Sequence, residues 1–112
     1  MIKKEVYMQQ GDVVLYKEKC VPKTATPVEV TGTEFVVEKG EGIHTHQICH
    51  PQLQQVLKVS ETKDRIYLEI EQELELVHEE HGTSQLEKGM FLSKIKEREY
   101  DYETEEVRET MD

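Results

Sequence analysis

The alternation of apolar and polar residues in RIYLEIEQELELVHEE constrains the fold more than any other feature of the chain. Ile66, Leu68 and Ile70 alternate with tyrosine and glutamate, and Leu74 and Leu76 continue with the same parity. A period of two is that of a β-strand with one buried face, whereas an amphipathic helix needs apolar residues at spacings of three and four. The segment therefore predicts one long strand or two strands in series.

Similar short patterns occur along the rest of the chain. They predict strands in DVVLYKEKC, PVEV, TEFVVEKG, GIHTHQI, LQQVLKV and GMFLSKIKE. The intervening residues include the Gly, Pro, Asp and Ser that turns require, and both VEVTGTEFVV and VLKVSETKDRIYLEI are typical of hairpins. No segment before residue 100 has a convincing helical pattern. We therefore predict an all-β fold, an antiparallel small barrel or sandwich of about six to eight short strands.

A chain of 112 residues has the length of one domain. We place the β domain in residues 1–98. The closing segment EYDYETEEVRETMD, residues 99–112, is predicted to be an acidic tail that forms a short helix or is disordered.

The composition restricts the classes of function. A net charge of -10 repels phosphate backbones, so binding to nucleic acid without regard to sequence is not expected. No apolar run approaches the roughly 18 residues of a membrane span, and MIKKEVYMQQ lacks the apolar stretch of a signal peptide. These features predict a soluble, cytoplasmic protein without a membrane partner, in which Cys20 and Cys49 are free thiols.

All five histidines fall in two short segments, GIHTHQICH and LVHEEHG. His44 and His46 share one face of a strand, because successive side chains alternate across it. His78 has the parity of the apolar face of its own strand, which predicts a semi-buried ring. His81 precedes Gly82 at a turn, where the backbone can bend to bring the ring beside His78. We expect the two segments to meet.

Converging imidazoles are suited to a divalent transition metal, of which zinc is the best match. Three protein ligands would leave one position for water, as in a metal-dependent hydrolase acting on a small-molecule substrate. Glu79 or Glu80 would then act as the general base or orient a ligand. The expected ligands are His44, His46 and His78, then His81, with Cys49 and His50 as outsiders.

Two other interpretations of the histidines stay open. Each segment taken alone is also typical of polar surface residues or of a core histidine bonded to a carbonyl group. Paired histidines can also perform acid–base chemistry without a metal. The HEEH sequence differs from the zincin motif HExxH, because its two histidines are three residues apart and lie outside any predicted helix.

A second class of function is binding without chemistry. A small acidic β protein could bind a basic protein partner, as a phage-borne inhibitor of a host factor does, or could be a small structural component. Tyr100 and Tyr102, flanked by carboxylates, would then form the contact.

The order of GDVVLY, EKGEGIHTHQI, LVHEEHGTSQLEKGMF and KEREYDYETEEVRETMD resembles a group of small uncharacterised proteins of bacteria and their phages. The resemblance covers most of the chain and implies no established activity. Ile43 departs from the pattern, in which a histidine often precedes the His-x-His alternation. The positions that the resemblance marks are Gly42, His44, His46, His78, Glu79, Glu80, His81, Gly82, Arg98, Glu99 and Tyr100.

GEGIHTH and LEKGMF are also loosely similar to cupins, which implies a small β-barrel whose metal is held by histidines and a carboxylate. The glutamate expected after the His-x-His is missing, since Gln47, Cys49 and His50 stand there.

Overall fold

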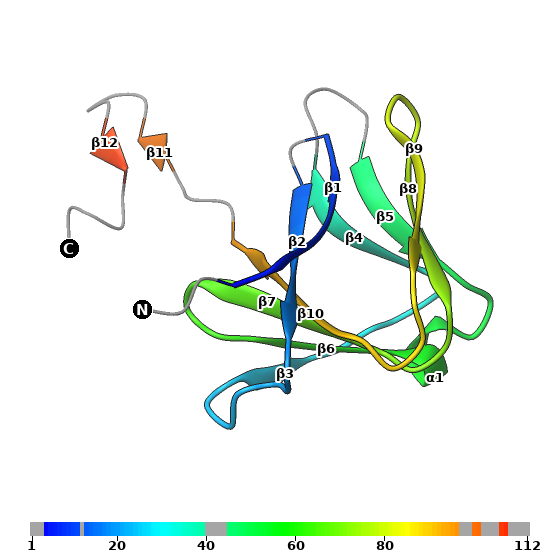
Figure 1. The fold of residues 1–112 in the computed structure, drawn as a ribbon, viewed down its shortest axis with the longest axis horizontal. Helices are drawn as coiled ribbons and strands as arrows, with labels where there is room; N and C mark the ends of the chain where they lie inside the picture. The colour runs from blue at the N-terminus through cyan, green and yellow to red at the C-terminus, as the bar shows by residue number, and fades with distance from the viewer. Residues whose placement is uncertain (1–3, 12, 40–44, 97–99, 102–105, 108–112) are drawn as a thin grey trace.

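The computed structural model describes residues 4–11, 13–39, 45–96, 100–101 and 106–107. Among these residues, antiparallel strands form two sheets that pack face to face, and the helix is a single turn (Figure 1). The predicted all-β class is confirmed.

The first sheet has six strands in the order β1-β2-β10-β7-β6-β3. Their bounds are β1 Val6–Gln10, β2 Val13–Glu18, β10 Phe91–Ile95, β7 Arg65–Ile70, β6 Leu57–Glu61 and β3 Thr26–Val28. The second sheet has the order β4-β5-β8-β9. Its strands are β4 Glu34–Lys39, β5 Thr45–Cys49, β8 Leu74–His78 and β9 Gly82–Leu86, and the helix α1 is Leu53–Val56.

The core lies between the two sheets and follows the alternation of the sequence. Leu68 and Ile70 of β7 face Leu74 and Leu76 of β8 across it, and Ile48 of β5 joins them. The alternating segment is therefore two strands in series, one in each sheet, with a break at residues 71–73. The apolar residues keep the same alternation through β7 and β8 because both strands turn their apolar face toward the same core.

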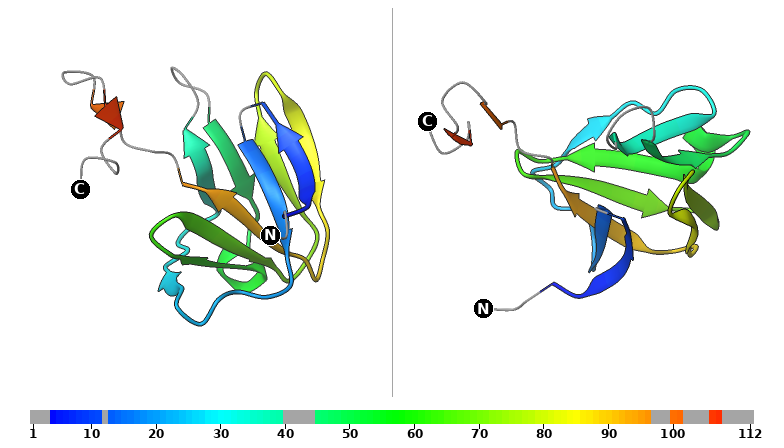
Figure 2. Two further views of the ribbon diagram at one scale, coloured as in Figure 1. Left: turned by 60° about the vertical axis from the view of Figure 1, so that its left-hand side comes forward. Right: turned by 90° about the horizontal axis from the view of Figure 1, so that it is seen from above.

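The two sheets also meet where β1 lies beside β9 (Figure 2). The hydroxyl group of Tyr7 donates to the carbonyl oxygen of Gln85 at 3.1 Å and accepts from the backbone N–H of Glu87 at 3.1 Å. This side of the molecule is thereby closed in the manner of a barrel.

Several expected elements differ from the structure. Residues 53–56 form α1 where the sequence predicts a strand, and β6 begins only at Leu57. β6 and β7 form the predicted hairpin. β3 and β4 do not form the other one, because β3 pairs with β6 in one sheet and β4 with β5 in the other. β1 and β9 are strands that the sequence patterns miss.

The described part of the acidic tail is extended. β11, Tyr100–Asp101, pairs with β12, Glu106–Val107. These four residues therefore form strands, where the sequence predicts a short helix or disorder. The other residues of the predicted tail lie outside the described ones.

Among the described residues, the structure contains no helix that is long and apolar enough to cross a membrane.

Candidate functional site

Three imidazole rings converge at one end of the core, where the β1–β2 and β8–β9 turns lie, at the top of Figure 1. The ring centroids of His46 and His78 are 4.2 Å apart, those of His78 and His81 are 4.6 Å apart, and those of His46 and His81 are 6.0 Å apart. The expectation that the two histidine segments meet is confirmed for these three residues. His44 lies outside the described residues.

The register of β5 and β8 explains why the first two rings meet. Gln47 pairs with Val77 and Ile48 with Leu76, so one further step places His46 opposite His78. Side chains opposite each other in an antiparallel pair lie on the same face and within contact. Both rings continue the inward rows of their strands and are 3% and 5% exposed, which confirms the predicted inward direction of His78.

The side-chain amide of Gln10 joins this cluster to both sheets. Gln10 ends β1 and is 3% exposed. Its Nε2 donates to the carbonyl oxygens of Leu76 at 2.8 Å and Gly82 at 3.0 Å, and its Oε1 lies 2.9 Å from Nδ1 of His46. One amide from the six-stranded sheet thus holds three segments of the other sheet.

These contacts define the tautomer of His46. Two carbonyl acceptors on Nε2 of Gln10 identify that atom as the NH₂ group, so the other end of the amide is the oxygen. An amide oxygen only accepts hydrogen bonds, so Nδ1 of His46 must donate the proton. In the neutral ring the lone pair is then on Nε2 of His46.

His78 has the opposite tautomer. Its Nδ1 accepts the backbone N–H groups of Glu80 at 3.0 Å and of His81 at 3.2 Å. A ring nitrogen that accepts cannot carry the proton, so in the neutral ring the proton is on Nε2 of His78. The same two bonds fix the turn that presents His81.

Gly11 makes room for the ring of His81. A Cβ atom on Gly11 would lie 2.6 Å from Cδ2 and 2.7 Å from Nε2 of His81, closer than any real contact of a Cβ atom. The φ angle of Gly11 is +57°, in the left-handed region that glycine adopts at little cost. The backbone at residue 11 therefore packs directly against the third ring.

The remaining candidates lie around or away from this cluster. Glu79 and Glu80 are exposed in the β8–β9 turn next to His81. Cys49 and His50 are at the other end of β5 from His46, and Nδ1 of His50 accepts the backbone N–H of Gln52 at 2.9 Å. Partial burial and the Glu34 carboxylate raise the pKa of the Cys49 thiol, which disfavours the thiolate that a metal requires.

In the part of the chain that the structure describes, no group of three or more His, Cys, Asp and Glu side chains has the arrangement of a metal site. The rings of His46 and His81 are nearly parallel at 5°, and that of His78 is tilted by 34° and 36° to them. His46 and His78 carry their protons on different ring atoms, so Nε2 is a hydrogen-bond acceptor in the first ring and a hydrogen-bond donor in the second.

Residues 9–96 match the model of a protein family described as a domain of unknown function (DUF8820). The chain belongs to this family. The matched residues make up most of the chain and include Gln10, Gly11 and both histidine segments, so the whole cluster lies inside the DUF8820 domain. No curated protein and no solved structure gives a significant match. The resemblances to the bacterial and phage group and to cupins stay predictions, because the family match bears on neither.

Sequence reasoning missed Gln10 and Gly11, although both belong to the site of this DUF8820 domain. The dipeptide QG is typical of a strand that ends at a turn, and nothing in it indicates a partner among the histidines. The only signal is that Gln10 precedes a glycine, where a backbone can approach a ring closely.

Proposed function

We propose that the imidazole cluster binds a divalent transition-metal ion, with zinc the best match to the donors, and that His46 and His81 are ligands. The observation that carries the proposal is the hydrogen bond from Nδ1 of His46 to Gln10. Metal-binding histidines commonly donate their second nitrogen to an oxygen in this way, which fixes the ring and leaves the other nitrogen for the metal.

The contacts of His78 favour a different role for it. Its Nε2 carries the proton while Nδ1 accepts two backbone N–H groups, so the ring would have to give up these bonds to become a ligand. We assign His78 to positioning the turn and the ring of His81. The third ligand in this proposal is His44, on the basis of the His-x-His spacing alone.

A hydrolytic reaction is the activity that such a site would support best. Three ligands leave a position for water, and a bound divalent ion makes that water a nucleophile near neutral pH. Glu79 and Glu80, exposed beside His81, are the candidates for the general base.

The proposal is tested by elemental analysis of the full chain purified without an affinity tag. We expect about one zinc ion or other divalent metal per chain. His46→Gln and His81→Gln should each remove most of it. The matched control is His50→Gln, which removes an imidazole at the far end of the same strand and should leave the metal content unchanged. Equal metal loss in all three variants, or none in the original chain, would overturn the proposal.

The opposite tautomers of His46 and His78 favour a second candidate, acid–base catalysis by imidazoles alone. Nε2 of His46 can act as a general base, and the Nε2–H of neutral His78 can donate a hydrogen bond to a developing negative charge, with the ring centroids 4.2 Å apart. A phosphodiester is a substrate that such a pair can cleave. Hydrolysis of bis(p-nitrophenyl) phosphate that survives treatment with a chelator and is lost in His78→Gln would favour this candidate over the metal.

A further inference from the structure

A pocket of about 160 Å³ lies where β2 and β10 separate. The two strands are paired as far as Tyr16 and Ser93, which leaves residues 13–15 of β2 and 94–95 of β10 beyond the last pair. Figures 1 and 2 show the strands diverging there. The residues that line the pocket come from β2, from β10 and from β4 of the other sheet, and they are Val14, Tyr16, Glu38, Lys94 and Ile95.

The separation of the strands explains why the pocket has residues from both faces of the six-stranded sheet. Val14, Tyr16 and Ile95 have the parity of the outer face, and Ile95 is 47% exposed. Lys94 instead has the parity of the core residue Leu92. A continuous ladder would divide these two sets, but beyond the last pair the sheet has a gap. The pocket is therefore an opening in the sheet, with apolar walls on the outside and Lys94 at its floor.

The ammonium group of Lys94 lies at this gap and is paired with a carboxylate from the other sheet. Its Nζ is 2.9 Å from Oε1 of Glu38 and donates to the carbonyl oxygen of Ile95 at 3.1 Å. The backbone N–H of Lys96 donates to Asp64 on the β7 side, so the carbonyl group of Ile95, one residue earlier, points toward the β2 side. The contact with that carbonyl places Nζ in the gap that β2 leaves.

The floor of the pocket, formed by Lys94 and Glu38, keeps one donor and one acceptor for a ligand. An ammonium group has three N–H bonds, of which two are used. Among the described residues, Oε2 of Glu38 has no hydrogen-bond partner. Because the two charges of the floor cancel, an anion would meet the carboxylate and a cation would meet the ammonium group. The floor therefore favours a neutral ligand that accepts and donates at adjacent atoms.

Stability alone does not account for an ion pair at this position. The side chains of Lys94 and Glu38 are 5% and 15% exposed. Buried ion pairs can often be replaced by apolar residues of similar volume without loss of stability. Their place at the floor of an open pocket supports a role in binding.

The volume of the pocket limits the ligand to a single ring. A cavity of about 150 Å³ in another protein binds benzene, so about 160 Å³ is sufficient for one six-membered ring and too small for a nucleoside. The ring of Tyr16 and the aliphatic side chains of Val14 and Ile95 provide the apolar contact that a flat ring requires.

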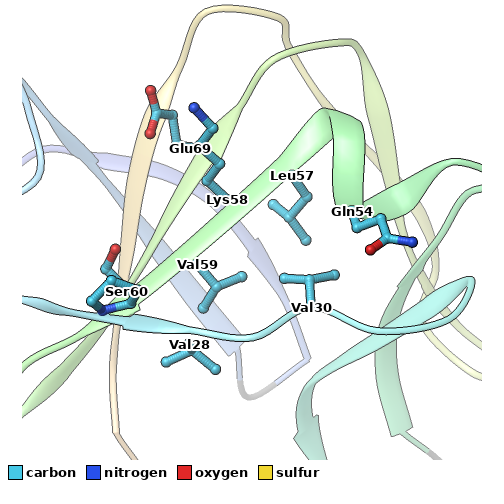
Figure 3. A pocket seen from close by; sticks show the side chains of 9 residues that line it. Val28, Val30, Gln54, Leu57, Lys58, Val59, Ser60 and Glu69 are labelled. Atoms are coloured by element: carbon cyan, nitrogen blue, oxygen red, sulfur yellow. The ribbon is translucent and has the colours of Figure 1, made fainter.

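The larger groove beside β6, of about 380 Å³, differs from this pocket (Figure 3). Leu57 and Val59 belong to the core at 1% and 4% exposed, and Lys58 stands opposite Glu69 in the β6–β7 pair. None of the described residues that line the groove is a buried charged side chain. The groove therefore lacks the donor and acceptor that distinguish the smaller pocket.

We infer that the pocket between β2 and β10 binds a neutral six-membered ring with adjacent N–H and C=O groups, the edge that pyridones and pyrimidine bases share. The N–H group of the ligand donates to Oε2 of Glu38, and its carbonyl oxygen accepts from Nζ of Lys94. The pocket shares no residue with the imidazole cluster, so the inference does not rest on the function proposed above.

The test uses the full chain and two neutral rings of equal size. 2-Pyridone has the N–H and C=O edge, whereas in 2-pyranone a ring oxygen replaces the N–H group. EDTA in the buffer removes any metal from the imidazoles. The methyl resonances of Val14 and Ile95 report binding in NMR titrations. We expect 2-pyridone to shift them and to bind about tenfold more tightly than 2-pyranone, the effect of one hydrogen bond to a charged group.

Two variants test the floor and the walls separately. The double variant Lys94→Met with Glu38→Met keeps a similar volume without the donor and the acceptor, and it should bind both rings equally. Val14→Phe should fill the pocket and abolish binding. Val6→Phe is the matched control, because Val6 is 51% exposed on β1, and it should leave binding unchanged. Melting temperatures confirm that each variant is folded.

Three results would overturn the inference. The first is the absence of any shift of the Val14 and Ile95 methyl groups with 2-pyridone. Equal affinity of the original chain for the two rings would show that the floor makes no hydrogen bond to the N–H group. A preference for 2-pyridone that persists in the double variant would place its binding elsewhere.

Discussion

Gln10 is the residue on which the arrangement of the imidazole cluster depends most directly. Replacing Gln10 with leucine removes the acceptor of His46 and the donor to Leu76 and Gly82 while keeping a similar volume. Buried groups left without a partner cost about 1–3 kcal/mol, so we expect a loss of this size in the free energy of unfolding. Urea denaturation measures it. Gln9→Leu is the matched control, because Gln9 is exposed and should lose less than about 0.5 kcal/mol.

Gly11 provides a second test of the same region. Gly11→Ala and Gly32→Ala both place a side chain at a positive φ angle, of +57° and +70°, and each should cost about 1 kcal/mol for that reason. Only the new Cβ atom of Gly11→Ala meets the ring of His81, since nothing lies within 4 Å of one at Gly32. We expect the first variant to be less stable than the second and to shift the ring resonances of His81 in NMR spectra. Equal stability with unchanged spectra would contradict the close packing.

The sequence predicts the direction of the buried histidines but not the residues that hold them. The parity of β8 is sufficient to turn His78 inward, because the leucines before it define the apolar face. Gln10 has no such local signal. Its partners are 36, 66 and 72 residues away, and only the packing of one sheet on the other brings them together.

Among the strands, those with apolar alternation are predictable and the polar ones are not. β7 and β8 carry a clear period of two. The sequence of β9, GTSQL, resembles that of a turn. It forms a strand because its backbone pairs with that of β8 in an antiparallel ladder of hydrogen bonds. The buried residues of α1, Leu53 and Val56, have the spacing of three that a helix requires, but four residues are too few for a helical period to be recognised. The predicted hairpin of β3 and β4 is wrong because a short connection between two strands does not specify that they pair with each other. Here the two strands belong to different sheets.

Three neighbouring strands share a polar network on the six-stranded sheet. The Glu18 carboxylate of β2 accepts from Lys4 at 2.9 Å and from the hydroxyl of Ser93 in β10 at 2.6 Å, and Arg65 of β7 donates to the same hydroxyl at 3.0 Å. Burial raises the pKa of Glu18, but the bonds from Lys4 and Ser93 and the nearby positive charges outweigh burial and lower it below its ordinary value of 4.5.

This shift predicts how stability depends on pH. A carboxyl group with a lowered pKa in the folded state contributes stability that is complete above its ordinary pKa and is lost as the pH falls through the folded value. We expect the original chain to lose stability below about pH 4.5 more steeply than Glu18→Gln does. Melting temperatures of both proteins between pH 7 and pH 3 measure the difference. Parallel curves would show that the network has no such effect.

The molecule as a whole is held together by its common core and by a buried ion pair between the sheets. Nζ of Lys94 in β10 lies 2.9 Å from the carboxylate of Glu38 in β4, and their side chains are 5% and 15% exposed. Removing one partner leaves a buried charge, so we expect Lys94→Met to lose about 3 kcal/mol of unfolding free energy. The double variant Lys94→Met with Glu38→Met should recover much of it. Urea denaturation of the three proteins tests this, and a double variant less stable than the single one would contradict it.

The all-β class follows from the sequence because apolar residues recur with a period of two along the chain. The order of strands within the sheets does not follow from the sequence. The alternation specifies which face of a strand is buried, but it does not specify which other strand lies beside that strand. The contact of β1 with β9 and the ion pair of Lys94 both depend on that order.

The large sequence separation between Gln10 and its hydrogen-bond partners also affects when the site can form during translation. A ribosome releases residue 10 early, whereas Leu76 and Gly82, which accept hydrogen bonds from that amide, emerge 66 and 72 residues later. The imidazole cluster can therefore assemble only after residue 82 has been released. A nascent polypeptide that stops before residue 82 carries the GIHTHQICH histidines without the turn that completes their surroundings.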